Sequence, residues 1–440
     1  MASEKRVRAA LVVIVVVALG VRVAWCLHAA RTPAIGDPPA YYFYGVQIAH
    51  GKGYTSYYQA FQRLAELTSG ADLRVPDHDV PSALYPPGYP ALLGVLFWFV
   101  LHSPLPKGYV AAAAGLNVAL SIATLLLAFA ILRSLFDTRV ALIAAALLAI
   151  YPNLVFYTGT LHWETTFIFL VMAALWLLIR QPWSDGGVPL RRLLVFSGLL
   201  GASVLIRPMS LGLVLALLVA SRAAGVPWRR VAAQCGIALG VVALMLMPWT
   251  VRNLVKMNAP VVVSTEVGAA MCVSRQPGAR GNKDYSHMDE YCLPSTKGVP
   301  FDEWEVRENN YGMARAFDFV VEHPLQEIRL WAPRVRYAYR TDHDSLDDAY
   351  TTSVNLRRIL GQVADRYYYG VLAFAALGLP TCLRKPPRLL LLLTTVSLAL
   401  TPILLFGAPR YKVPVTPFVT MMAAAGFVSV ADRLRGRPQD

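Results

Sequence analysis

An apolar run and an acidic motif adjoin one another in AALVVIVVVALGVRVAWCLHAARTPAIGDPPAYY, residues 9–42. The run covers residues 9–28, which is the length that an α-helix needs to cross a bilayer. Because Lys5 and Arg6 precede it, we expect this end of the chain to lie in the cytoplasm. The run is longer than the apolar part of a typical signal peptide, so we expect it to remain as the first membrane span. Asp37 then lies just outside the membrane.

Long apolar runs continue through the rest of the chain. Of its 440 residues, 56% are hydrophobic and only 15% are charged, which is typical of a protein that crosses the membrane many times. We therefore predict an all-α polytopic membrane protein with about ten transmembrane helices. The expected spans are residues 9–28, 108–132, 140–157, 163–179, 193–206, 208–221, 231–249, 368–383, 388–407 and 413–431.

The net charge of +14 fits this topology. Most basic residues fall in short turns between apolar runs, where they mark the cytoplasmic side, so we do not expect nucleic acid as a partner. An even number of spans also leaves both termini in the cytoplasm. A further apolar segment, PPGYPALLGVLFWFVL at 86–101, is short and proline-rich, and counting it as a span would reverse every later turn. We expect it to be a juxtamembrane or re-entrant helix on the outer side.

This topology divides the chain into three parts. Residues 1–249 form a transmembrane core that includes a first external loop at 29–107. Residues 250–367 form one large external loop or subdomain, and residues 368–440 hold the last spans. An insert of that size is expected to fold or to lie against the membrane surface.

Two carboxylates, Asp37 and Glu164, adjoin the external ends of apolar runs. Acidic side chains at the edge of a span are costly and are usually functional, so both are candidate catalytic residues. Each also has a structural alternative. Asp37 can form the turn before Pro38, and Glu164 can be an N-terminal acid that stabilises a helix dipole. His162 lies beside Glu164, and a lone histidine is more often structural.

Four basic residues lie on the outer side of this topology, against the charge rule. They are Arg207, Arg252, Arg410 and Lys412. An outer arginine at the level of the headgroups suits a lipid phosphate, whereas the alternative is a long side chain that merely marks a helix end. The chain has no HExxH, GxSxG or P-loop motif, so the energy for any transfer has to come from an activated donor.

Two of the five cysteines, Cys272 and Cys292, share the large external loop. If this loop faces an oxidising compartment, we expect them to form a disulfide, and the alternative is two free thiols. The other cysteines lie in or beside apolar runs and are expected to be packing residues.

Five segments occur in the order of a known family. They are GD at 36–37 with Tyr41, YPPGYP at 85–90, the stretch 151–164, PWTVRN at 248–253 and PRYKVP at 409–414. In these segments the chain resembles bacterial membrane glycosyltransferases of the GT-C superfamily. It is most similar to the family-39 group, which includes protein O-mannosyltransferases and lipid A aminoarabinose transferases. The chain departs from this pattern after Asp37, where prolines replace a frequent second acidic residue.

The resemblance implies an inverting transfer of a monosaccharide from a polyprenyl-phosphate sugar on the outer face of the cytoplasmic membrane. Asp37 would be the general base, and Glu164 would orient the acceptor, bind a cation or hold a cationic partner. The acceptor would be a lipid, a glycan or a protein, and a divalent cation is left open as a cofactor. The same four outer basic residues would hold the donor phosphate.

The resemblance also implies side chains that position the donor or the acceptor. These are Tyr41, Tyr42, Tyr85, His162 and Tyr411. Two alternatives to an enzyme remain. One is a polytopic transporter or flippase of a lipid-linked glycan, with Asp37 and Glu164 as ion sites, and the other is a non-catalytic subunit that binds such a glycan.

Overall fold

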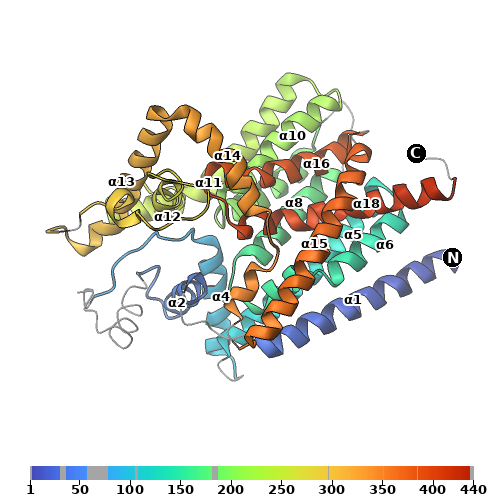
Figure 1. Cartoon of the computed structure of the whole chain (residues 1–440), viewed down its shortest axis with the longest axis horizontal. Helices are drawn as coiled ribbons and strands as arrows, with labels where there is room; N and C mark the ends of the chain where they lie inside the picture. The colour runs from blue at the N-terminus through green and yellow to red at the C-terminus, as the bar shows by residue number, and fades with distance from the viewer. Residues whose placement is uncertain are drawn as a thin grey trace.

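The computed structural model describes residues 2–29, 36–56, 78–104, 108–180, 187–295, 297–349, 351–383 and 385–436. Within these ranges the chain is built from helices, and two isolated bridges are the only β-type pairing. Figure 1 shows that α1 (Ala2–Ala29) begins and α18 (Thr416–Leu434) ends at the same end of the molecule. At the opposite end lie α2 (Asp37–Ala49), α12 (Glu266–Cys272) and α13 (Phe301–Glu322).

Five helical segments of the described chain are long and apolar enough to cross a membrane. They are Glu4–Ala29 in α1, α5 (Tyr109–Leu135), α11 (Trp228–Met257), α16 (Pro386–Ala399) with α17 (Thr401–Leu404), and η5 (Pro409–Val415) with α18. A sixth span results if α6 (Thr138–Ala149) and the helical segment Pro152–Gly159, which bend by 57°, count as one.

Each of the ten expected spans coincides with a helix or a helix pair. Those not yet named are α8 (Glu164–Ile179), α9 (Leu190–Val204), η2 (Pro208–Leu211) with α10 (Gly212–Ala223), and α15 (Val354–Cys382). Of these, α9 has only 15 residues, so its axis is shorter than the hydrocarbon layer. The all-α polytopic fold is confirmed, and the count of ten spans stays a prediction.

Close backbone contact joins α15 to α18. A Cβ atom on Gly378 would lie 2.1 Å from the carbonyl oxygen of Met422, and one on Gly426 would lie 2.0 Å from that of Phe374. Only glycine allows the two helices to approach so closely, as small residues commonly do in membrane bundles. This contact fixes the helix that follows the last external turn.

Helices outside the candidate spans cover the end of the molecule opposite the termini. Here α4 (Gly88–His102) packs on α2, and its 15 residues agree with a short helix at 86–101, whose outer position stays a prediction. The large external segment is shorter than expected because α11 continues to Met257 and α15 begins at Val354. It holds α12, α13 and α14 (Pro324–Ala338).

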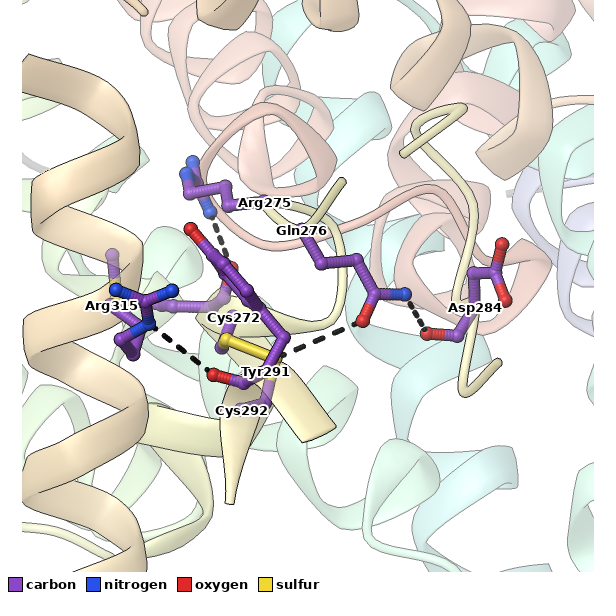
Figure 2. The surroundings of a disulfide bond; sticks show 8 residues. Cys272, Arg275, Gln276, Asp284, Tyr291, Cys292 and Arg315 are labelled. Carbon is purple, nitrogen blue, oxygen red and sulfur yellow. Dashed lines mark hydrogen bonds between the residues drawn. A yellow bond between two sulfur atoms is a disulfide. The ribbon is translucent and has the colours of Figure 1, made fainter. Parts of the chain in front are cut away.

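A disulfide links Cys272, the last residue of α12, to Cys292 in the π-helical turn η3 (Met288–Cys292), as Figure 2 shows. This pairing is one of the two alternatives that the sequence left open. The loop that it closes is also tied to the last external turn, because the Gly407 N–H donates to the Gly281 carbonyl over 2.7 Å.

Candidate active site

Three segments that lie far apart in the chain converge on one position. Asp37 is the first residue of α2, where prolines occupy the first turn because its N–H groups need no partner within the helix. Glu164 opens α8, and His162 lies in the turn just before it. Arg410 lies in η5, between α17 and α18. These residues come from the first, second and last of the segments that the sequence predicts to be external.

All three nitrogens of the Arg410 guanidinium have partners. Nη1 donates to Asp37 Oδ2, Nε donates to Glu164 Oε1, and Nη2 lies 2.9 Å from His162 Nδ1. One arginine therefore joins the two carboxylates that the sequence singled out. Glu164 is also the first residue of a helix, which is the position of an acid that stabilises the helix dipole. Its carboxylate, however, pairs with Arg410.

The two carboxylates differ in their access to solvent. The Asp37 side chain is 27% exposed, whereas that of Glu164 is 0% exposed. Burial raises the pKa of Asp37, but the Arg410 guanidinium and the Tyr85 hydroxyl, 2.7 Å from Oδ1, outweigh it and hold this pKa below the usual aspartate range. Asp37 is therefore an ionised carboxylate that a substrate can reach, and Glu164 is a buried anchor for Arg410.

Arg207 brings a second guanidinium to the same place. Its Nη1 donates to Glu266 Oε2 over 2.8 Å, and its Nη2 donates to the Tyr41 hydroxyl over 3.3 Å. The guanidinium carbons of Arg207 and Arg410 lie 4.9 Å and 5.6 Å from the centre of the Trp163 ring. The buried indole is thus a common support for both cations.

The charges of this cluster are nearly balanced. Asp37, Glu164 and Glu266 supply the carboxylates, and Arg207 and Arg410 supply the guanidinium groups. An anion that binds here has to compete with these carboxylates for the arginines. Within the described ranges, no three His, Cys, Asp or Glu side chains lie together as metal ligands would. We therefore derive no step through a divalent cation.

Lys412 and Arg252 lie outside this cluster and have other partners. Lys412 is 1% exposed, and its Nζ lies 3.1 Å from Oδ1 of Asp342, which is equally buried. Arg252 Nη1 donates to the Ser82 carbonyl over 2.7 Å, and its Nη2 donates to the carbonyl of Tyr54. Both cations therefore hold external segments together, and the structure does not bring either of them to Asp37.

The expected positioning tyrosines divide between two faces. Tyr41 is 1% exposed, and its ring lies 4.9 Å from that of Tyr85, so both belong to the cluster around Asp37. Tyr42, the next residue of α2, packs against Phe97 with ring centres 5.8 Å apart. Neighbouring residues of a helix point about 100° apart, which directs Tyr42 away from the site. Tyr411 is half-buried beside Arg410 in η5.

Two acidic residues of the site gave no signal in the sequence. Glu266 opens α12 and pairs with Arg207. Asp348 ends η4 (Asp344–Asp348), and its Oδ2 lies 2.6 Å from His162 Nε2. Both belong to the large external segment, where acidic residues are ordinarily solvated. Only the folding of this segment against the rest of the chain brings Glu266 to Arg207 and Asp348 to His162.

Solved structures with the same arrangement of helices are known. The chain is similar to an oligosaccharyltransferase from Archaeoglobus fulgidus in complex with zinc and sulfate, with a TM-score of 0.51 and 15% identity over 97% of this chain and 50% of that one. It is also similar to ArnT from Cupriavidus metallidurans bound to undecaprenyl phosphate, with a TM-score of 0.53 and 13% identity over 97% of this chain and 61% of that one. The chain has the GT-C fold.

A further GT-C structure is the archaeal oligosaccharyltransferase AglB from Archaeoglobus fulgidus in complex with an inhibitory peptide and a dolichol-phosphate. Its TM-score is 0.50 at 13% identity, over 98% of this chain and 51% of that one. The chain thus spans about half the length of the oligosaccharyltransferases that it matches. No protein-family profile and no curated protein sequence matches it. The resemblance to the GT-C superfamily is confirmed at the level of the fold, and the closer subfamily stays a prediction.

Proposed function

We propose that this protein with the GT-C fold is an inverting glycosyltransferase that moves a monosaccharide from a polyprenyl-phosphate sugar to an acceptor hydroxyl on the outer face of the cytoplasmic membrane. One observation carries this proposal. An accessible carboxylate, Asp37, lies within hydrogen-bond distance of Arg410, and a second arginine shares the Trp163 ring with it. A base and two phosphate ligands are the groups that such a transfer needs.

Asp37 is the general base in this reaction. The acceptor oxygen attacks the anomeric carbon as the bond from that carbon to the phosphate oxygen breaks. The acceptor proton passes to the Asp37 carboxylate, and the bonding electrons leave with the polyprenyl phosphate. Attack on the face opposite the leaving group inverts the anomeric centre. The 27% exposure of the Asp37 side chain lets an acceptor reach it.

Arg410 has two tasks in this mechanism. In the resting protein it pairs with Asp37 and lowers the pKa of that carboxyl, which makes Asp37 a weak base. The donor phosphate competes with Asp37 for Arg410, and Arg207 is the second cation that binds this phosphate. As the phosphate replaces Asp37 as the partner of Arg410, the basicity of Asp37 rises. Binding of the donor thereby raises the basicity of Asp37, which then accepts the proton of the acceptor hydroxyl.

Glu164 keeps Arg410 in the site during this exchange. Of the roles that the resemblance implies for it, holding a cationic partner has the most support, because its carboxylate is fully buried against Arg410. Removal of Glu164 would leave a buried guanidinium without its permanent partner, which is costly.

The bound lipids of the neighbours agree with a lipid donor. The ArnT structure holds undecaprenyl phosphate, and one oligosaccharyltransferase structure holds a dolichol-phosphate. These ligands belong to those proteins, and their transfer to this chain is part of the proposal.

The test uses the purified protein in detergent or nanodiscs with a polyprenyl-phosphate monosaccharide labelled in the sugar, and an extract of envelope lipids and glycans as acceptor. The proposal predicts that labelled sugar enters the acceptor fraction while free polyprenyl phosphate accumulates in equal amount. Proteoliposomes that move the intact labelled lipid between leaflets, with no release of polyprenyl phosphate, would instead identify a flippase.

A further inference from the structure

His162 lies between two charged partners in the candidate active site. Its side chain is 6% exposed, and both ring nitrogens have partners. Nδ1 lies 2.9 Å from Nη2 of Arg410, and Nε2 lies 2.6 Å from Oδ2 of Asp348. The ring therefore joins the last external turn to the end of η4.

The chemistry of these partners fixes the protons on the ring. A guanidinium nitrogen only donates, so Nδ1 has to accept and carries no hydrogen. A carboxylate only accepts, so Nε2 carries the hydrogen and donates it to Asp348. His162 is thus a neutral imidazole in one tautomer. The opposite tautomer, or the imidazolium ion, would point an N–H group at Arg410 and repel it.

Hydrogen bonds fasten the turn that ends at Asp348. Within the same turn, Asp344 accepts hydrogen bonds from the Tyr157 hydroxyl and from Asn153 Nδ2, the latter over 3.1 Å. The Ser345 hydroxyl donates to Asn153 Oδ1 over 2.6 Å. η4 is therefore fastened to the segment that precedes His162, and this places the Asp348 carboxylate 2.6 Å from the ring.

We propose that Asp348 is a positioning residue for the transfer reaction, which acts through the tautomer of His162 to aim the Arg410 guanidinium. This rests on the proposed function of Arg410 as a ligand of the donor phosphate. With the tautomer fixed, His162 gives Arg410 one uncharged acceptor that does not compete with the phosphate. The arginine keeps its orientation when it releases Asp37.

The kinetic test is a double-mutant cycle of Asp348→Asn with His162→Gln, read as KM for the labelled donor and as kcat. Orienting partners of this kind typically contribute 10- to 100-fold, so we expect Asp348→Asn to lower kcat/KM for the donor by about tenfold or more, mainly through KM. In the His162→Gln background the same change should have no further effect. Additive losses would show that Asp348 does not act through His162 and would overturn the proposal.

The chain offers a matched control and a conservative variant. Asp365 lies 2.9 Å from His343 Nδ1 with a side-chain exposure of 24%, close to the 20% of Asp348, but this pair is outside the cluster around Arg410. Asp365→Asn should leave the donor KM unchanged. Asp348→Glu keeps a carboxylate and should recover most of the lost kcat/KM. An equal loss in Asp348→Glu and Asp348→Asn would contradict a role through hydrogen-bond chemistry.

A second readout needs no transfer activity. In protein with ¹⁵N-labelled histidine, assigned with the His162→Gln variant, we expect His162 to show the neutral form protonated at Nε2, and Asp348→Asn to populate the other tautomer. If wild-type protein transfers no sugar but these signals appear, the proposed function fails while the tautomer lock stands. An imidazolium in the resting protein, or an unchanged tautomer in Asp348→Asn, would overturn the inference whatever the activity.

Discussion

Asp37 accepts a hydrogen bond from Arg410, which lies 373 residues further along the chain. The carboxylate follows the first apolar run, and the arginine precedes the last one. Their pairing joins two ends of the helix bundle's sequence and brings a candidate base to a candidate phosphate ligand. The charge of Arg410 also lowers the pKa of Asp37, so Asp37 becomes a stronger base only when Arg410 binds another anion.

Replacement of Arg410 by glutamine should shift the pH dependence. In wild-type protein the arginine holds the pKa of Asp37 below its ordinary range, so the carboxylate stays ionised at a pH where an ordinary aspartate is already protonated. Without the cation, burial favours the protonated carboxyl and the pKa rises. The acid limb of kcat/KM should therefore move to higher pH in Arg410→Gln, measured as residual transfer across a pH series. If the acid limb stays at the wild-type pH in Arg410→Gln, the group that titrates in this limb is not Asp37.

Lysine in place of either arginine should weaken donor binding more than it weakens the fold. Lysine keeps the charge but loses the fork of donors that reaches two partners at once. We expect the donor KM to rise several-fold in Arg207→Lys and further in Arg410→Lys, whose arginine has three partners. Arg315→Lys, in α13 beside Tyr291, is the control. An unchanged donor KM in both site variants would show that the two arginines do not bind the donor phosphate and only mark helix ends.

Removal of the disulfide should loosen the last external turn. Its cysteines are 20 residues apart, and a loop of this size contributes about 3 kcal/mol by constraining the unfolded chain. Cys272→Ser with Cys292→Ser should lower the Tm, and transfer activity should fall because Gly281 in this loop holds Gly407 near Arg410. The control is Cys26→Ser, which removes a free thiol. An unchanged Tm would show that the loop is held without the bridge.

Labelling of single cysteines in intact cells should place the site on the outer face. With the free cysteines removed, Ser286→Cys lies in the large external segment and should react with an impermeant thiol reagent. Ser134→Cys, in the last turn of α5 and on the predicted cytoplasmic side, should react only after the cells are opened. Both serines are exposed, so accessibility alone does not separate them. The reverse pattern would invert the predicted orientation.

The sequence pointed to site residues that are charged and lie at the ends of apolar runs, where charges are rare in membrane proteins. Asp37, Glu164 and Arg410 stood out because charges at the ends of apolar runs are costly, and the structure brings these three together. Lys412 stood out for the same reason, but it follows Arg410 by two residues in a tight helix and points elsewhere. Its partner, Asp342, is a long-range contact that no local pattern reveals.

The sequence did not predict where α15 begins or that Asp348 is the partner of His162. The first half of α15 carries charges such as Arg357 and Arg366, so its apolar pattern begins only near residue 368 although the helix starts at Val354. Asp348 lies in a polar turn with other acidic residues, and nothing in that turn marks it as a partner of His162. Tertiary packing decides both cases.

The most direct test compares wild-type protein with Asp37→Asn in transfer of labelled sugar from a polyprenyl-phosphate donor. Asparagine has the shape of aspartate but cannot take a proton at neutral pH, so turnover should fall by about 10²-fold or more while the melting temperature and donor binding stay close to wild type. Glu164→Gln should give a different result, with weaker donor binding, because it acts through Arg410. Turnover near the wild-type level in well-folded Asp37→Asn would contradict the assignment of Asp37 as the general base.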